Sequence, residues 1–221
     1  MTNWSKIAAG YNHTAAIKSD GTLWTWGQNA QGQLGDGTTV NKSSPIQVGN
    51  LTAWKSVAGG QHHTIATKSD GTLWTWGYNA NGQLGDGTRV YKSSPIQVGN
   101  LTNWSKIAAG DYHSVAIKSD GTLWAWGYNY YGQLGDGTIV NKSSPIQVGS
   151  LTNWSNISGG NNYTAAIKTD GTLWAWGQNQ YGQLGDGTTV FKSSPIQVGN
   201  LTNWKNLPES SCTSTHTMAI R

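Results

Sequence analysis

The 221-residue chain is poor in cysteine, phenylalanine, proline and charge, and it contains no long apolar run. Its single cysteine, Cys212, excludes an internal disulfide framework and a cysteine-based metal site. No apolar stretch approaches the ~20 residues that a membrane-spanning helix needs, so we expect no membrane partner. Charged residues make up 11% and hydrophobic residues 36%, which excludes a charge-rich disordered chain.

The first residues also lack the basic segment and apolar stretch of a secretory signal peptide. This absence predicts a cytoplasmic or virion-associated protein. The net charge of +4 is modest, and the lysines recur singly instead of gathering in a stripe. Because nucleic-acid modules cluster their basic residues, this pattern argues against a nucleic-acid ligand.

Glycine and tryptophan are abundant, with 30 and 13 residues, and they recur at regular intervals. Trp4, Trp54, Trp104, Trp154 and Trp204 are spaced by 50 residues. A period near fifty is typical of propeller blades and too long for most helical repeats. We therefore expect a single propeller domain over residues 1–221, with repeats 3–52, 53–102, 103–152 and 153–202 and a C-terminal half-repeat 203–221.

Within the first repeat, alternating residues predict four strands and no helix. The first three are Trp4–Ala9, Thr14–Ser19 and Thr22–Trp26, and the fourth begins at Pro45. Asp20-Gly21 predicts a two-residue type I′ turn with positive φ at both positions. We thus predict an all-β fold, a β-propeller of four-stranded antiparallel blades, with four 50-residue repeats plus an extra hairpin. The repeated tryptophans are expected to fill the wedges between neighbouring blades.

Several motifs of the repeat together resemble the regulator of chromosome condensation repeat. They are His13-Thr14, Asp20-Gly21-Thr22, Trp26-Gly27 and Gly32-Gln33-Leu34-Gly35, and the resemblance covers the chain four times. It implies a β-propeller fold, but not one particular function. Because family members typically close a ring of seven blades, the chain resembles a short version, of the kind that suits a bacterial or phage protein.

Two activities known in that family are not expected in this chain. The nucleotide-exchange factor uses a partner surface that spans a larger ring with diverse blades. The ultraviolet-B photoreceptor carries Gly-Trp-Arg-His-Thr repeats, whereas this chain has Gly10-Tyr11-Asn12-His13-Thr14 at the matching positions. The sensing tryptophan and the arginine are both absent there.

The four repeats differ from one another mainly on one predicted face of the propeller. In an antiparallel meander, the first-to-second and third-to-fourth connections emerge together, and we call this side the loop face. The other connections emerge on the opposite side, where the turn is Ser/Thr-Asp-Gly in every repeat and the inter-repeat link changes only at Ser150. Neutral drift in loops is the alternative explanation, but drift should also affect the opposite face.

Tyrosine, asparagine, glutamine and histidine dominate the variable positions of the loop face. Tyrosine offers a large contact area at low entropic cost, and the amides offer adaptable hydrogen bonds. The third repeat concentrates four tyrosines, which predicts a hot spot for a protein or glycan ligand. The candidate ligand-binding residues are Tyr11, His62, Asp111, Tyr112, Asn161, Asn162, Tyr78, Tyr128, Tyr130, Tyr131, Tyr181, Arg89, Tyr91 and Phe191.

We predict no catalytic residues, no metal site and no cofactor. His13, His63 and His113 occupy equivalent positions, but Tyr163 replaces the fourth member, which argues against a ring of metal-binding histidines. These imidazoles are expected to bond to a backbone carbonyl. The Asp-Gly pairs lack the ligand spacing of a calcium loop, and no carboxylate pair or Ser-His-Asp arrangement stands out. The chain is therefore not expected to be an enzyme.

The C-terminal half-repeat leaves an unmatched hairpin. Trp204 restarts the first strand, and His216–Arg221 matches His13–Lys18. The surplus is C-terminal if each blade follows the order of the repeat, and N-terminal if each blade begins with the third strand. An exposed edge must be covered, so we expect a homo-oligomer linked through the surplus hairpin, the alternative being a closed four-bladed ring.

Two functional hypotheses follow. The first is a non-catalytic binding module that recognises a protein or glycan through the loop face. The second is a structural assembly component, for example of a virion or a surface array, whose function is contact between chains.

Overall fold

The computed structural model describes residues 3–208, 219 and 220, and regular secondary structure within them consists of strands alone. Cys212 and most of the expected C-terminal hairpin, including His216, lie outside the described residues. The predicted all-β class is confirmed. No helix in the described part of the chain is long and apolar enough to cross a membrane.

Each repeat folds into one antiparallel four-stranded sheet, a blade, whose strands pair in chain order. Blade 1 contains β1 (Trp4–Ala9), β2 (His13–Lys18), β3 (Leu23–Gly27) and β4 (Lys42–Gln47). The other blades repeat this pattern: β5 (Trp54–Gly59), β6 (His63–Lys68), β7 (Leu73–Gly77) and β8 (Lys92–Gln97) in blade 2; β9 (Trp104–Ala109), β10 (His113–Lys118), β11 (Leu123–Gly127) and β12 (Lys142–Gln147) in blade 3; β13 (Trp154–Gly159), β14 (Tyr163–Lys168), β15 (Leu173–Gly177) and β16 (Lys192–Gln197) in blade 4.

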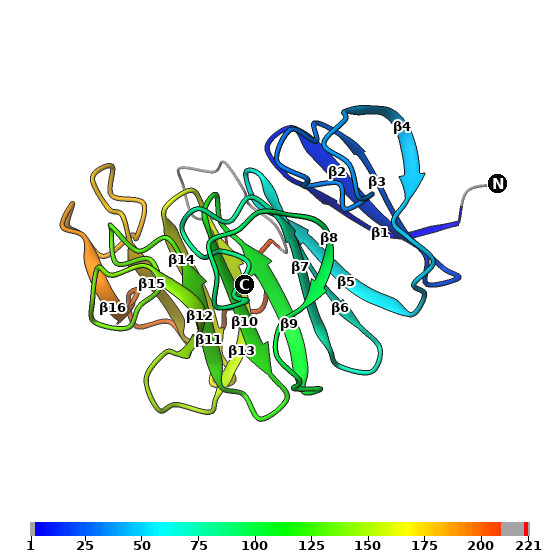
Figure 1. Ribbon diagram of the computed structural model, residues 1–221. Helices are drawn as coiled ribbons and strands as arrows, with labels where there is room; N and C mark the ends of the chain where they lie inside the picture. Colours follow the sequence, from blue (N-terminus) through cyan, green and yellow to red (C-terminus); the bar gives the residue numbers. More distant parts are fainter. Residues whose placement is uncertain (1–2, 209–218, 221) are drawn as a thin grey trace.

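The blades follow one another along an arc, with blades 1 and 4 at its opposite ends (Figure 1). The first strands of successive blades contact one another and form the inner side of the arc. After blade 4 the chain continues into the half-repeat, where Lys205 N donates to Ile220 O at 2.9 Å. Each blade therefore follows the order of the repeat, and the surplus segment is C-terminal.

Tryptophan side chains fill the wedges between blades, as predicted. Between blades 1 and 2, Trp54 and Trp76 pack against Ile17, Leu23 and Val48 of the preceding blade. The same arrangement recurs at the two following interfaces. Burial of these large rings is the main apolar contribution to blade stacking.

The Asp-Gly hairpin differs from the predicted two-residue turn. Gly21 has a φ of 77°, but Asp20 does not share a positive φ, and Ala53 is the one described non-glycine residue that has one. Lys18 pairs with Thr22 around a three-residue loop, closed by Gly21 N donating to Lys18 O at 2.9 Å. The type I′ prediction was wrong because Asp20 acts through its carboxylate, which accepts from the Thr22 amide at 2.9 Å.

The fourth strand also begins earlier than predicted. It starts at Lys42, opposite Gly27, so Pro45 lies inside the strand and not at its start. Proline is tolerated there because β4 is the outer edge of its sheet and the ladder is irregular between Thr25 and Gly27.

One apolar face of blade 1 has no blade packed on it. Trp4 is 38% exposed and Ile7 is 71% exposed, whereas the equivalent Trp54 is 3% exposed. Trp4, Ile7, Ala16, Trp26 and Pro45 line a hollow on this side, which we call the open face of blade 1. The counterparts of Trp4, Ile7, Ala16 and Trp26 in blades 2 to 4 pack against the preceding blade.

The wedge arrangement predicts unequal effects for equivalent substitutions. Trp126→Ala removes a fully buried indole between blades 2 and 3 and should lower the free energy of unfolding by about 3–5 kcal/mol. Trp26→Ala acts at the open face, where the indole is only half-buried, and should cost clearly less. Urea denaturation followed by tryptophan fluorescence compares the two variants. Equal losses would contradict the proposed role of the wedges.

Candidate ligand-binding face

The connections emerge on two opposite sides of the blades, as predicted. On the loop face, Gln28 N donates to Asn12 O at 2.8 Å, which joins the β1–β2 turn to the β3–β4 loop. On the other side, Trp54 N donates to Gly21 O at 3.0 Å, which joins the β2–β3 turn to the inter-blade link. The variable loop residues of the four repeats therefore share one side of the molecule.

A buried asparagine holds each β3–β4 loop in shape. In blade 1, Asn29 Oδ1 accepts from Leu34 N at 2.9 Å, and Asn29 Nδ2 lies 3.2 Å from Val40 O. Asn79, Asn129 and Asn179 make the same contacts in the other blades. These loops have few strand hydrogen bonds, so the asparagine side chain satisfies their backbone groups instead.

An aspartate fixes the second half of the same loop. The Asp36 carboxylate accepts from Thr38 N at 2.9 Å and from Asn29 Nδ2 at 3.0 Å, and it pairs with Lys42 at 3.1 Å. Burial opposes ionisation of this carboxyl, but the hydrogen bonds and Lys42 together hold its pKa below the usual value. The Asp36-Gly37-Thr38 segment thus forms a turn that is held by its own hydrogen bonds and by Lys42.

Aromatic side chains on the loop face form a continuous ribbon across blades 2, 3 and 4. Tyr78 is the first branch point, with its ring 4.8 Å from Tyr91 and 5.9 Å from Tyr112. Tyr112 leads to Tyr128, at 6.3 Å, and Tyr131 reaches Phe191 of blade 4 at 5.2 Å. We call the connected set the aromatic ribbon: His62, Tyr78, Tyr91, Tyr112, Tyr128, Tyr130, Tyr131 and Phe191.

The ribbon has a half-buried base and an exposed tip. Tyr78, Tyr112, Tyr128 and Tyr131 are half-buried, whereas Tyr130 is 61% exposed. Burial raises the pKa of Tyr128, and the neighbouring Tyr131 and Tyr130 raise it further. Its phenol therefore stays neutral and keeps a hydroxyl that can donate a hydrogen bond.

The remaining candidate residues lie outside the ribbon. Tyr11 and Tyr181 are 54% and 74% exposed and stand apart from it, and Arg89 is an exposed loop residue of blade 2. Asn161 and Asn162 are half-buried and bond to each other, with Asn162 Nδ2 also 3.1 Å from Gln178 Oε1.

Asp111 is buried in its turn instead of lying open to a ligand. Burial lowers the pKa of His62, and the nearby Asp111 carboxylate partly offsets that shift. The Asp111 side chain is therefore not on the surface of the loop face.

The repeated histidines belong to a hydrogen-bonded relay between blades. His13 Nε2 lies 3.0 Å from Thr64 Oγ1 of the next blade. The Thr64 hydroxyl donates to Gln33 O at 2.8 Å, so it accepts from the imidazole, and Trp76 Nε1 donates to the same carbonyl at 2.9 Å. We call this set the inter-blade relay; it recurs from His63 through Ser114 and from His113 through Thr164.

The relay corrects one expectation and explains the chemistry of these histidines. Their partner was predicted to be a backbone carbonyl, which was wrong, because the side-chain hydroxyl of the next blade lies in reach of Nε2. Burial lowers the pKa of His13 to about 4, with a smaller effect of His62, and lowers those of His63 and His113 to about 3. The imidazoles are therefore neutral donors that join blades.

No group of three or more histidine, cysteine or acidic side chains able to hold a metal ion occurs within residues 3–208, 219 and 220. The repeats also differ from one another in the first strand of each blade, which a comparison of the loops alone does not show. Lys6, Ser56, Lys106 and Asn156 occupy the same repeat position there. Comparing strand residues as well as loop residues would have found it.

Comparisons with known proteins place this arrangement among propellers of one kind. A family model described as the RCC1-like domain matches residues 2–221. The ultraviolet-B receptor UVR8 of Arabidopsis thaliana is 48% identical over 44 residues, which are 20% of this chain and 10% of the receptor.

Two solved structures share the fold at low sequence identity. Human WBSCR16 is 23% identical with a TM-score of 0.84, over 95% of this chain and 56% of that one. Prp20p of Saccharomyces cerevisiae, studied for its binding to Gsp1p and histones, is 24% identical with a TM-score of 0.82, over 96% of this chain and 54% of that one. The chain thus spans about half the length of these two structures, and its matched segment is a small part of the plant receptor.

The lowered histidine pKa values predict a loss of stability in mild acid. Unfolded histidines take up a proton near pH 6.5, whereas the folded ones do so only at about 4 or below. Each relay histidine should therefore lower the free energy of unfolding by about 1.4 kcal/mol for each pH unit as the pH falls from 6.5 to about 4.5. His113→Tyr, which copies Tyr163 of blade 4, should reduce this slope by one histidine's share. Urea denaturation at several pH values measures it, and an unchanged slope would refute the assignment.

Proposed function

The chain belongs to the RCC1-like domain family, and we propose that it is a non-catalytic module that binds a protein or glycan through its loop face. The observation that carries the proposal is the aromatic ribbon, which spans three blades on a frame held by buried asparagines. Exposed aromatic side chains gathered on one surface are typical of an interaction site.

The frame of the loop face favours tight binding because little has to be ordered when a ligand arrives. The loop backbone is already fixed by Asn79 and Asp86, which bond to Leu84 N and Thr88 N at 3.0 and 2.9 Å. Tyrosine loses only two side-chain torsions on contact, so its large area is gained at low entropic cost. The half-buried Tyr128 and Tyr131 limit the freedom of the exposed Tyr130.

The comparisons support a protein ligand in general terms. Prp20p, which shares the fold, is a protein that binds Gsp1p and histones. A glycan is the second ligand class, because exposed and half-buried tyrosine rings such as Tyr130 and Tyr131 also suit the apolar faces of sugars. Ultraviolet-B sensing is not proposed, since Tyr11 and Asn12 stand where the photoreceptor has tryptophan and arginine. Nucleotide exchange is not proposed either, since it uses a partner surface that spans a larger ring with diverse blades.

A triple substitution tests this function without introducing residues foreign to the repeat. Tyr128→Gln, Tyr130→Ala and Tyr131→Gln together copy the loop of blade 1, which has Gln28, Ala30 and Gln31. The wild-type chain is first screened on a glycan array and against a displayed peptide library. For any ligand found, the triple variant should bind at least about tenfold more weakly, because the centre of the ribbon is lost.

The matched control is Ser119→Thr, which copies Thr169 in the turn on the opposite face. It should leave binding unchanged, and circular dichroism should show both variants folded. A ligand that binds the folded triple variant as tightly as the wild type would place the binding site elsewhere.

A second function, contact between chains, is favoured by the open face of blade 1. We propose that a second copy of the chain covers this face with the far side of its half-repeat. In the half-repeat Ala219 packs toward blade 4, while the adjacent Ile220 points away and is 65% exposed. Ile17, the counterpart of Ile220, packs against blade 2 within the chain. In the proposed assembly, Ile220 of one chain would pack against blade 1 of a second chain in the same way.

Light scattering and sedimentation test the assembly. The wild-type chain should have the mass of a dimer or larger species, because the exposed Trp4 and Ile7 belong to a surface that is buried at every other blade. Ile7→Lys should give a folded monomer, since a charge at this 71% exposed site disturbs no internal contact. A monomeric wild-type chain at high concentration would end this proposal and leave the loop-face proposal intact.

A further inference from the structure

The lysines of the chain fall into three groups with different surroundings. Those at the start of each fourth strand pair with aspartates at 3.1–3.7 Å: Lys42, Lys92, Lys142 and Lys192. Those at the end of each second strand lie over tryptophan rings at 3.6–4.8 Å: Lys18, Lys68, Lys118 and Lys168. The remaining four belong to the first strands or their counterpart in the half-repeat: Lys6, Lys55, Lys106 and Lys205.

The last group carries the positive excess of the molecule. None of these four lysines forms an ion pair with a carboxylate of the described residues. The described acidic residues are in the turns and loops, where their own hydrogen bonds hold them, as Asp20 is held by Thr22 and Asp36 by Thr38. The inner side of the arc is therefore cationic, while the loops are close to neutral.

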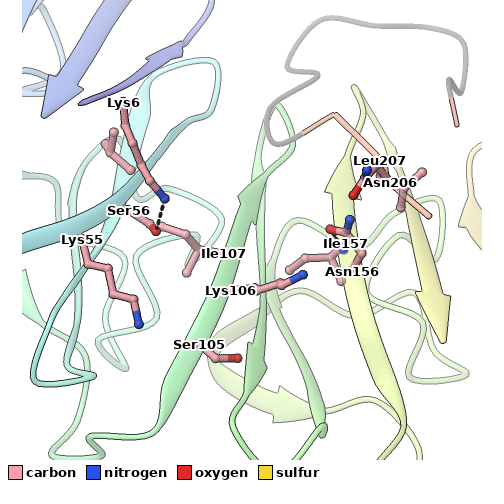
Figure 2. A pocket seen from close by; sticks show the side chains of 11 residues that line it. Lys6, Lys55, Ser56, Ser105, Lys106, Ile107, Asn156, Ile157, Asn206 and Leu207 are labelled. Atoms are coloured by element: carbon pink, nitrogen blue, oxygen red, sulfur yellow. Dashed lines mark hydrogen bonds between the residues drawn. The ribbon is translucent and has the colours of Figure 1, made fainter. Parts of the chain in front are cut away.

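Three of these lysines line one cavity. Lys6, Lys55 and Lys106 line a hollow of about 370 Å³ on the inner side of the arc, together with Ser56, Asn156 and Asn206. The lysines come from three successive blades (Figure 2), and none of the described lining residues is acidic. We call this hollow the inner cavity.

The polar groups of the inner cavity can act mainly as hydrogen-bond donors. Lys6 Nζ donates to Ser56 Oγ at 3.2 Å, which leaves the Ser56 hydroxyl hydrogen available. Asn156 Oδ1 accepts from Ile157 N at 2.9 Å, so its amide NH₂ is the part left for a ligand. Figure 2 shows Lys106 extending toward Asn156 across the cavity. Ammonium, hydroxyl and amide donors without a carboxylate competitor form a site for an anion.

We propose that the inner cavity binds a compact phosphate-containing polyanion with two or more phosphoryl groups. A single charge would neutralise one lysine and leave two others in repulsion, whereas a polyphosphate can contact ammonium groups of three blades at once. The cavity is too short for an extended strand of nucleic acid, whose backbone would need a continuing basic groove. The site is separate from the loop face and does not depend on a ligand there.

Isothermal titration calorimetry with inorganic tripolyphosphate tests the proposal at low ionic strength. The wild-type chain should bind it, with an affinity that falls as salt is added. Lys6→Asn, Lys55→Ser and Lys106→Asn together should weaken binding at least about tenfold. The substitutions at Lys6 and Lys106 copy Asn156, and the substitution at Lys55 copies Ser105. Each new residue therefore already occurs at the same repeat position in another blade.

Two matched variants sharpen the result. Exchange of the same three lysines for arginine keeps the charge and should retain binding. The loop-face variant carrying Tyr128→Gln, Tyr130→Ala and Tyr131→Gln should bind tripolyphosphate like the wild type, which separates this site from the proposed function. Absence of binding to the wild type, undiminished binding to the neutral variant, or stronger binding of single-stranded DNA than of tripolyphosphate would each overturn the proposal.

Discussion

Stacking of one blade on the next depends on a buried tryptophan that still satisfies its only polar atom. Trp76 is inaccessible to solvent between two blades, yet its indole N–H donates to Gln33 O at 2.9 Å. The same carbonyl accepts the Thr64 hydroxyl, which in turn accepts from His13. Because an unpaired Trp76 indole would make its burial more costly, packing of this ring in the wedge is coupled to formation of the inter-blade relay. This explains why Trp76 and its copies recur, whereas Gln33 contributes only its backbone carbonyl to the relay.

The constant framework leaves two kinds of position free to differ. On the loop face, Asn29 and Asp36 hold the backbone, so the outward side chains can change without altering the loop shape. On the inner side of the arc, the second and third residues of β5, β9 and β13 are not fully buried and are likewise released from tight packing. The aromatic ribbon and the inner cavity occur at these two places, and both present side chains on rigid elements, which favours recognition with little reorganisation.

The period, the strands and the two faces could be predicted because each follows from a strong local pattern. Errors arose where a side chain replaced the expected backbone interaction. Asp20 stabilises its turn through the carboxylate, which removes the need for a positive φ, and His13 finds a hydroxyl of the next blade. Loop membership identified the aromatic ribbon, but it could not show that Asp111 is buried or that Tyr11 and Tyr181 stand apart from it. The open face and the inner cavity depend on how blades are arranged in space, which one repeat does not encode.

Hydrogen exchange measured by NMR tests whether the loop face is a preformed surface. The amides of Leu84, Leu134 and Leu184 lie in loops and are bonded to asparagine side chains at 2.9–3.0 Å. In the absence of any ligand, we expect these amides to exchange as slowly as the strand amides of β6 and β10. Exchange at the rate of an unstructured peptide would contradict it, because the aromatic ribbon would then stand on loops that have no fixed shape.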